Sequence, residues 1–416
     1  MFPARTILRR VPVLAVVLAA CLVSVAGAAD DDAALRKRAL ELNNITGNDA
    51  IEGKVRALVE DAAATKKLLA AAVPLAKEKE QPFNVNALYI LGRTAHKLKE
   101  YDAGQVFYRA YADQALKLQS GQRLAQAFGG LIDLLYETKK FDECAKVCRE
   151  VLDAQGGEEL ERFKVLVLRR MIQALSRQGK TDDALKLVNN LLKVDPDNWL
   201  TLELKGWVLR EAGKHDEAAK TYEDVLERIS KDERLKKEEK EEFGNEIRYL
   251  LSGVYVDLNK IDKAAEHLKA LLAKDPDNPS YNNDLGYIWA DNDMNLEEAE
   301  RLIRKAIDED RKRRQKANPN QKLEDSKDNA AYLDSLGWVL YKQKKYKEAK
   351  KYMEEAVKDP EGQHIEIFDH LGDVLMALGE KSAAVAAWKK GIEVAGQSKR
   401  EQERKAAVEK KLKANE

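Results

Sequence analysis

The chain has 416 residues, and its 72 Lys and Arg residues balance 72 Asp and Glu residues, so the formal net charge is zero. This balance argues against a general nucleic-acid binder, which needs a surplus of basic side chains to neutralise phosphates. Hydrophobic residues make up 44% and prolines number only 9. A disordered chain and a membrane channel both fit this composition poorly, whereas strong helix formers dominate and predict an all-helical protein.

Residues 1–28 are typical of an export signal. A positive segment contains Arg5, Arg9 and Arg10, an apolar run follows, and Ala26-Gly27-Ala28 forms a small-residue cleavage site. The sequence therefore predicts an exported protein in the periplasm or cell envelope, with secretion or lipid anchoring as alternatives. An uncleaved N-terminal membrane anchor is a further alternative, although Pro12 stands near the start of the apolar run.

Lipidation at Cys21 is a separate hypothesis. Leu18-Ala19-Ala20-Cys21 resembles the bacterial lipobox, in which the cysteine carries the lipid. The following residues stay apolar, where a lipoprotein usually turns polar. Membrane attachment is expected only through this modification.

The two other cysteines, Cys144 and Cys148, lie four residues apart on one predicted helix. A straight helix points both side chains the same way, which disfavours a disulfide. They are interpreted as small core residues, and no metal or cofactor is predicted.

Residues 29–80 are expected to form an N-terminal helical cap or a degenerate repeat. Two helices are predicted there, one near 31–43 and the other near 50–79.

An internal repeat then organises the chain. Shifting residues 165–198 by 34 positions superposes Gly179 on Gly213 and Ala184 on Ala218. The clearest copies begin at Leu285-Gly286, Leu336-Gly337 and Leu371-Gly372. Small residues at such places let two helices approach closely, so the pattern predicts stacked antiparallel helix pairs.

These residues resemble the tetratricopeptide repeat family over about 81–394. Leu-Gly in the first helix, Ala and an aromatic residue in the second, and prolines such as Pro196 and Pro276 match its pattern. The resemblance implies an all-α, right-handed alpha-alpha superhelix of about eight helix pairs. Two copies depart from the pattern, since Ile132 and Ile172 occupy the small-residue position.

Two insertions interrupt the regular spacing. The Lys/Glu-rich segment near 230–243 is expected to lengthen a helix. The segment 310–329, which includes the basic residues from Arg311 to Lys316, is expected to be a solvated loop, with a docking patch for acidic groups as the alternative. Residues 395–416 are expected to form a C-terminal capping helix.

We find no constellation of catalytic residues. Gly179-Lys180-Thr181 resembles the end of a phosphate-binding loop, but Ala174 stands where the earlier glycine would be needed. Asp291, Asp293 and Asn295 begin like a calcium loop, yet Leu296 occupies the glycine position. The chain is therefore predicted not to be an enzyme.

The resemblance implies that a ligand contacts defined positions of the first helices, on the concave side. Those positions hold Arg93, Lys97, Arg169, Arg170, Arg210, Asn283, Tyr287, Asp334, Trp338 and Tyr341. This groove would be basic in the early repeats and aromatic and acidic in the late ones. The other interpretation is that Trp338 and Tyr287 pack between repeats and that the charges form a solvated face.

The predicted function is a non-enzymatic scaffold in the cell envelope that binds a peptide segment or partner protein in this groove. Neither the partner nor the oligomeric state is defined by the sequence. Alternatives are a module that binds glycan or peptidoglycan fragments, and a self-assembling structural protein.

Overall fold

The computed structural model describes residues 32–155, 157–319, 327–396 and 398–415. Regular structure in these segments is helical throughout, without a β-strand. The chain divides into two compact units, one ending at Leu191 and the other beginning at Leu192. The predicted signal peptide at 1–28 and the proposed lipidation site Cys21 lie outside the described residues.

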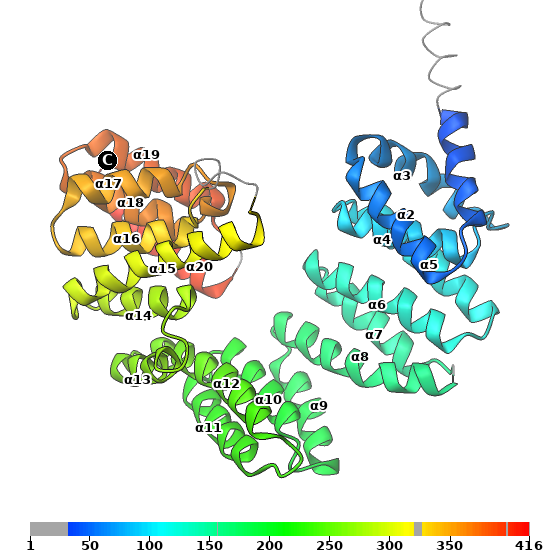
Figure 1. Cartoon of the computed structure of the whole chain (residues 1–416), viewed down its shortest axis with the longest axis horizontal. Helices are drawn as coiled ribbons and strands as arrows, with labels where there is room; N and C mark the ends of the chain where they lie inside the picture. The colour runs from blue at the N-terminus through cyan, green and yellow to red at the C-terminus, as the bar shows by residue number, and fades with distance from the viewer. Residues whose placement is uncertain (1–31, 156, 320–326, 397, 416) are drawn as a thin grey trace, which may run out of the picture. The chain divides into compact units, whose positions relative to one another are not determined.

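The first unit begins with a helix over residues 32–40 and a 3₁₀ turn, η1 (Glu41–Asn44). Its further helices are α2 (Asn48–Glu60), α3 (Ala62–Ala76), α4 (Val85–Lys97), α5 (Tyr101–Lys117), α6 (Gly121–Glu137), α7 (Phe141–Asp153), α8 (Gly157–Arg177) and α9 (Thr181–Val194), within which the division falls (Figure 1).

The second unit continues with α10 (Trp199–Glu211), α11 (His215–Lys231), α12 (Lys237–Asp257), α13 (Ile261–Leu272), α14 (Pro279–Asp291), α15 (Leu296–Ala317), α16 (Ala330–Lys342), α17 (Tyr346–Ala356), η3 (Pro360–Gly362), α18 (Ile365–Ala377), α19 (Lys381–Val394) and α20 (Lys399–Asn415). We call α4, α6, α8, α10, α12, α14, α16 and α18 the first helices, and the helix after each a second helix. The predicted all-helical fold of repeated helix pairs is confirmed.

Close approach of first and second helices depends on glycine. A Cβ atom at Gly206 would lie 2.9 Å from Cε1 of Tyr222, and one at Gly372 would overlap the indole of Trp388. In both pairs the bulky residue comes 16 positions after the glycine. Tyr222 and Trp388 are almost completely buried, so the aromatic ring fills the space that the glycine leaves open.

The turn inside seven of the eight pairs uses one residue in the left-handed conformation, and the turn between α14 and α15 uses two. Gly179, Gly213 and Gly379 have φ values of 75°, 73° and 79°. The amide of the next residue closes the turn, as in Lys180 N to Leu175 O at 3.0 Å. Lys99 holds the same conformation between α4 and α5, although its φ of 59° is less favourable for a side chain with a Cβ.

The N-terminal segment and the two insertions differ in part from their predicted structure. Residues 50–79 are not one helix, because Asp61 leaves helical geometry and its side chain caps α3 by accepting the Ala64 amide at 3.3 Å. The first insertion extends α11 to Lys231 and begins α12 at Lys237, so it lengthens two helices with a break between them where one longer helix was expected. The second is not wholly a loop, since Arg311 to Lys316 lie in the last turns of α15.

Near the C-terminus, α20 packs on α18 and α19. None of the described helices is both long and apolar enough to cross a membrane.

Candidate functional site

Several predicted groove residues contact a neighbouring helix. In the first unit, Arg93 forms an ion pair with Glu52 of α2, and Lys97 is exposed at the end of α4. Arg210 Nε in the second unit lies 2.9 Å from Asp257 Oδ2 of α12. Arg93 and Arg210 therefore brace adjacent helices as well as carrying charge on the first-helix face.

In the last repeats the first helices carry a stacked aromatic group. The Trp338 ring stacks on His370 at 4.0 Å between centroids and on Tyr341 at 4.9 Å. Trp338 Nε1 also donates to Asp291 Oδ1 of α14 at 3.0 Å. The tryptophan thus ties α14, α16 and α18 together.

One member of this stack, His370, also contacts a carboxylate. His370 Nδ1 is 2.9 Å from Asp334 Oδ1, and both side chains are buried. Burial opposes the imidazolium, but the charge of Asp334, its hydrogen bond and the charge of Glu366 outweigh that effect and raise the pKa of His370. The protonated form of His370 is therefore favoured over that of a free histidine.

A second contact crosses the intervening repeat. Tyr287 of α14 donates from its hydroxyl to Glu366 Oε1 of α18 at 2.8 Å. Arg404 of α20 reaches the same carboxylate at 2.7 Å. Burial would raise the pKa of Glu366, but Arg404, His370 and Arg400 lower it, so the carboxylate stays ionised.

These contacts correct the predicted groove. Asp334 is 5% exposed and Trp338 is 8% exposed, and Tyr287 is held by Glu366. The side chains of Asp334 and Trp338 fill the space between the first helices, and Tyr287 is half-buried there. Tyr341 is half-buried beside them. The alternative interpretation, inter-repeat packing, holds for Trp338 and Tyr287.

Asn283 lies in a different environment at the start of α14. It is 7% exposed, and its Oδ1 has no hydrogen-bond partner among the described residues. Its Nδ2 contacts Asp284 Oδ1 at 3.3 Å, and the Tyr249 hydroxyl donates to Asp284 Oδ2 at 2.6 Å. Tyr249 remains 38% exposed, so one aromatic face is open to solvent here.

A hollow between α6 and α8 includes two other predicted residues, Arg169 and Arg170. Its volume is about 340 Å³, and Gly129 and Phe163 form part of its wall. Arg170 Nη2 contacts Asp133 Oδ1 at 2.8 Å and its guanidinium lies 4.5 Å above the Tyr136 ring. This hollow combines basic side chains with an apolar lining.

Sequence reasoning missed the apolar part of the hollow. Leu166 lines it and is 64% exposed, and neighbouring Val165 is 71% exposed. An available signal was the run Val165 to Leu168, which places apolar side chains on all sides of α8. Such large exposed apolar side chains on one helix are typical of interaction surfaces.

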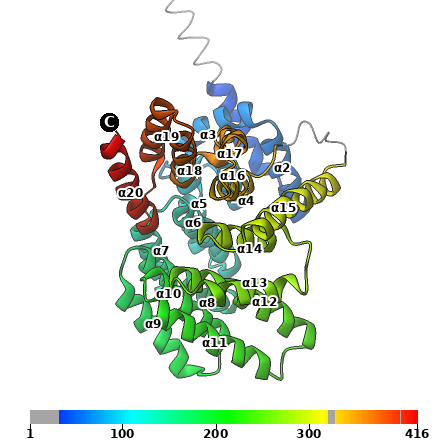
Figure 2. The same ribbon diagram turned by 90° about the vertical axis from the view of Figure 1, so that its left-hand side faces the viewer.

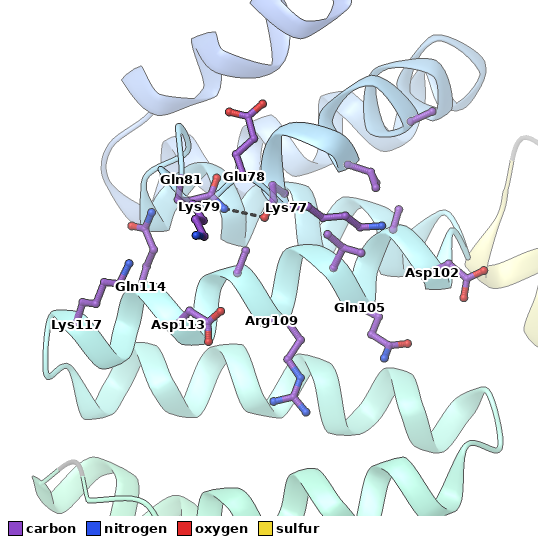
Figure 3. A pocket seen from close by; sticks show the side chains of 16 residues that line it. Lys77, Glu78, Lys79, Gln81, Asp102, Gln105, Arg109, Asp113, Gln114 and Lys117 are labelled. Carbon is purple, nitrogen blue, oxygen red and sulfur yellow. Dashed lines mark hydrogen bonds between the residues drawn. The ribbon is translucent and has the colours of Figure 1, made fainter.

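A larger hollow of about 780 Å³ lies between α3 and α5. Figure 3 shows labelled polar side chains along its border, with Lys117 and Gln114 near one end and Asp102 near the other. Gln114 donates to Phe83 O at 2.6 Å, and Gln81 donates to Ala76 O at 2.8 Å. These polar groups serve the local structure, and the hollow was not predicted because neither helix is a first helix.

No group of three or more metal-ligating side chains occurs in residues 32–415, leaving aside the gaps at 156, 320–326 and 397. Cys144 and Cys148 are free, buried thiols of α7.

Comparison with protein-family models identifies tetratricopeptide repeats at residues 169–233 and 249–314 with one model, and at 329–359 with a second. The matched ranges cover helices from α8 to α17. The pairs α4–α5, α6–α7 and α18–α19, which lie outside the matched ranges, are also formed by consecutive helices packed on each other.

A TPR repeat-containing protein of Pseudomonas aeruginosa is 28% identical over 205 residues. The match covers 49% of this chain and 30% of that protein, so the chain spans less than a third of its relative. Among solved structures, a tetratricopeptide repeat protein of Parabacteroides merdae has 15% identity and a TM-score of 0.47, covering 68% of this chain and 98% of the other. A thermophilic TPR protein of Thermus thermophilus has 19% identity and a TM-score of 0.37, covering 50% and 98%.

Proposed function

Because this chain belongs to the tetratricopeptide repeat family, we propose that it is a non-enzymatic scaffold that binds a segment of a partner protein through the α6–α8 hollow. Tetratricopeptide repeats are protein-interaction modules in general. In the last repeats, side chains of the first helices fill the space between those helices. Between α6 and α8 an open hollow remains.

The observation that carries the proposal is the combination of Leu166 with Arg169 and Arg170. Exposed apolar area supplies binding free energy when a partner removes it from water. The Arg170 guanidinium is fixed by Asp133 and Tyr136, and with five N–H donors it can contact a second carboxylate as well. The ligand is therefore a protein segment that places an apolar side chain next to an acidic one.

Photo-crosslinking from the surface tests this directly. A photoreactive amino acid replaces Leu166 in the full chain, and a matched protein carries it at Leu118, which is similarly exposed at 53% at the end of α5. We expect one partner protein to be joined at 166 and not at 118. The same set of products from both positions would contradict a specific site.

Direct binding then identifies the chemistry. The captured segment is synthesised and titrated into the full chain and into the Leu166→Lys variant, with Leu118→Lys as control. We expect loss of binding only in Leu166→Lys. Displacement of the segment by soluble glycan fragments would favour the glycan-binding alternative instead.

The cell-envelope location forms a second part of the proposal and is supported by the signal-like sequence at 1–28. Fractionation of bacteria that express the whole chain, followed by mass measurement, tests it. Cleavage after Ala28 without a lipid is expected, whereas a lipid-modified Cys21 would establish anchoring. An unprocessed protein in the cytoplasm would contradict export.

A further inference from the structure

The C-terminal helix α20 is strongly charged and places three of its cations on one side. Arg400, Arg404 and Lys411 are separated by four and seven residues, which is the spacing of a single helix face. Figure 2 shows α20 alongside α18 and α19. This basic face is directed at α18.

The opposing surface of α18 is a row of carboxylates, Glu366, Asp369 and Asp373, which we call the acidic row. Arg404 contacts Glu366 at 2.7 Å and Asp369 at 3.1 Å. Lys411 contacts Asp369 and Asp373, each at 2.6 Å. Each carboxylate of the row is therefore paired with a cation of α20.

With α20 in place, the acidic row is largely buried. Few apolar side chains hold α20 against it. The side chain of Asp369 is 6% exposed and that of Asp373 is 17% exposed. Among the described side chains of α20, Val408 alone belongs to the buried core. Attachment of α20 consequently depends mainly on ion pairs.

The acidic row needs a cationic partner because three carboxylates lie on one face of α18 at spacings of three and four residues. Desolvation raises the pKa of Asp373, and Lys411 acts in the opposite direction. Loss of α20 would uncover the row and leave these neighbouring carboxylates without cations, so that they repel one another. Replacement by another helix with cations at the same spacing would restore the pairs.

From this complementarity we propose that the acidic row is a docking surface for a basic helix of a partner protein, and that α20 occupies it within the chain until the partner helix exchanges with it. The site is separate from the α6–α8 hollow and does not depend on the function proposed there. The partner helix must carry cations equivalent to Arg404 and Lys411. Because α20 begins at Lys399, soon after α19 ends at Val394, it stays at high local concentration, and the exchange favours partners that bind strongly or are abundant.

The test uses full-length protein and a fluorescent synthetic peptide of residues 399–415. In the Arg404→Glu/Lys411→Glu variant the altered α20 is repelled from the acidic row, so the peptide should bind at least about tenfold more tightly than it binds the natural chain. A Lys410→Glu/Lys413→Glu variant changes exposed cations of the same helix and should behave like the natural chain. A peptide of the same composition in scrambled order should bind neither protein.

Equal affinity of the charge-reversed variant and the natural chain would overturn the proposal, as would equal binding of the scrambled peptide. Asp369→Asn in the charge-reversed background should reduce peptide affinity, and unchanged affinity would place the peptide elsewhere. Amide hydrogen exchange of the natural chain gives a measurement that needs no variant. Raising salt from 0.05 to about 1 M should accelerate exchange in α20 more than in α19, because salt weakens ion pairs; equal acceleration would contradict electrostatic attachment.

Discussion

Tyr287 and Glu366, which are 79 residues apart, share a hydrogen bond of 2.8 Å that joins α14 to α18 past the intervening helix pair α16–α17. First helices of a repeat array usually meet their immediate neighbours only. Here the long side chains of Tyr287 and Glu366 reach each other across α16. A polar and aromatic cluster consequently fills the face that was expected to receive a ligand.

Replacing Tyr287 by Phe should therefore destabilise the second unit. The change removes a hydrogen bond to an ionised carboxylate in a buried setting, which costs about 1.5–3 kcal/mol. Urea unfolding followed by circular dichroism measures the change. Tyr346→Phe is the control, because the Tyr346 ring packs on Tyr341 and no hydrogen bond of its hydroxyl is seen in the described residues; an equal loss in both variants would refute the assigned role.

The His370–Asp334 pair should make stability depend on pH. The folded-state pKa of His370 is raised above its ordinary value of 6.5, so the folded protein holds this proton more tightly than the unfolded chain. Its contribution is complete below pH 6.5 and is lost as the pH rises through the folded-state pKa. Thermal unfolding between pH 5.5 and 9 should show this loss in the natural chain and not in His370→Gln.

Four influences set the pKa of His370. Asp334 and Glu366 favour its proton, whereas burial and Arg404 oppose it. His267 behaves in the opposite sense, because burial and Arg248 lower its pKa. Subtracting the stability of His370→Gln from that of the natural chain at each pH isolates the contribution of the His370 proton. Parallel pH profiles for the two proteins would contradict that contribution.

Gly372→Ala should be strongly unfavourable although alanine is the better helix former. The new Cβ would overlap the Trp388 indole, and overpacking of this kind costs about 1–3 kcal/mol. Gly244 is the matched control, since no atom lies within 4 Å of the place that a Cβ would take there. Gly244→Ala should leave stability unchanged or raise it by up to about 1 kcal/mol in the same urea experiment.

Asp328 should hold the end of α15. Its Oδ1 lies 2.8 Å from Arg311 Nε and 3.2 Å from Arg314 Nη2, and its side chain is only 11% exposed. Asp328→Asn should therefore increase hydrogen exchange in the last two turns of α15. Asp308→Asn removes a more exposed partner of Arg311 and should have little effect.

The basic insertion illustrates why charge alone misled the prediction. Arg311 and Arg314 were assigned to a solvated loop or a docking patch, but both pair with Asp328, which follows them in the sequence. The pairing requires the chain to bring Asp328 back beside the end of α15 after the insertion. No local sequence pattern indicates that return.

The helix pairs were predictable because their packing is local. Gly206 and Tyr222, like Gly372 and Trp388, are separated by a constant 16 residues. The departures follow the same logic, since the position 16 residues after Ile132 holds the smaller Cys148. A larger residue on the first helix is thus matched by a smaller residue on the second.

The candidate surfaces were less predictable because they depend on how successive repeats are rotated. Family positions put Arg169 and Arg170 on the first-helix face, and in the structure both line the α6–α8 hollow. The same positions placed Trp338 and Tyr287 on that face without revealing that α14, α16 and α18 would close over them. Burial by non-adjacent helices leaves no periodic signal in any one segment.

The bond from Tyr287 to Glu366 also limits how this end of the protein could change in evolution. Repeat arrays normally gain or lose whole helix pairs, because each pair needs only its neighbours. Deleting or duplicating α16–α17 here would separate or misalign two residues that must meet across it. The final three pairs are therefore expected to be inherited as one indivisible block, while variation in repeat number is confined to other parts of the array.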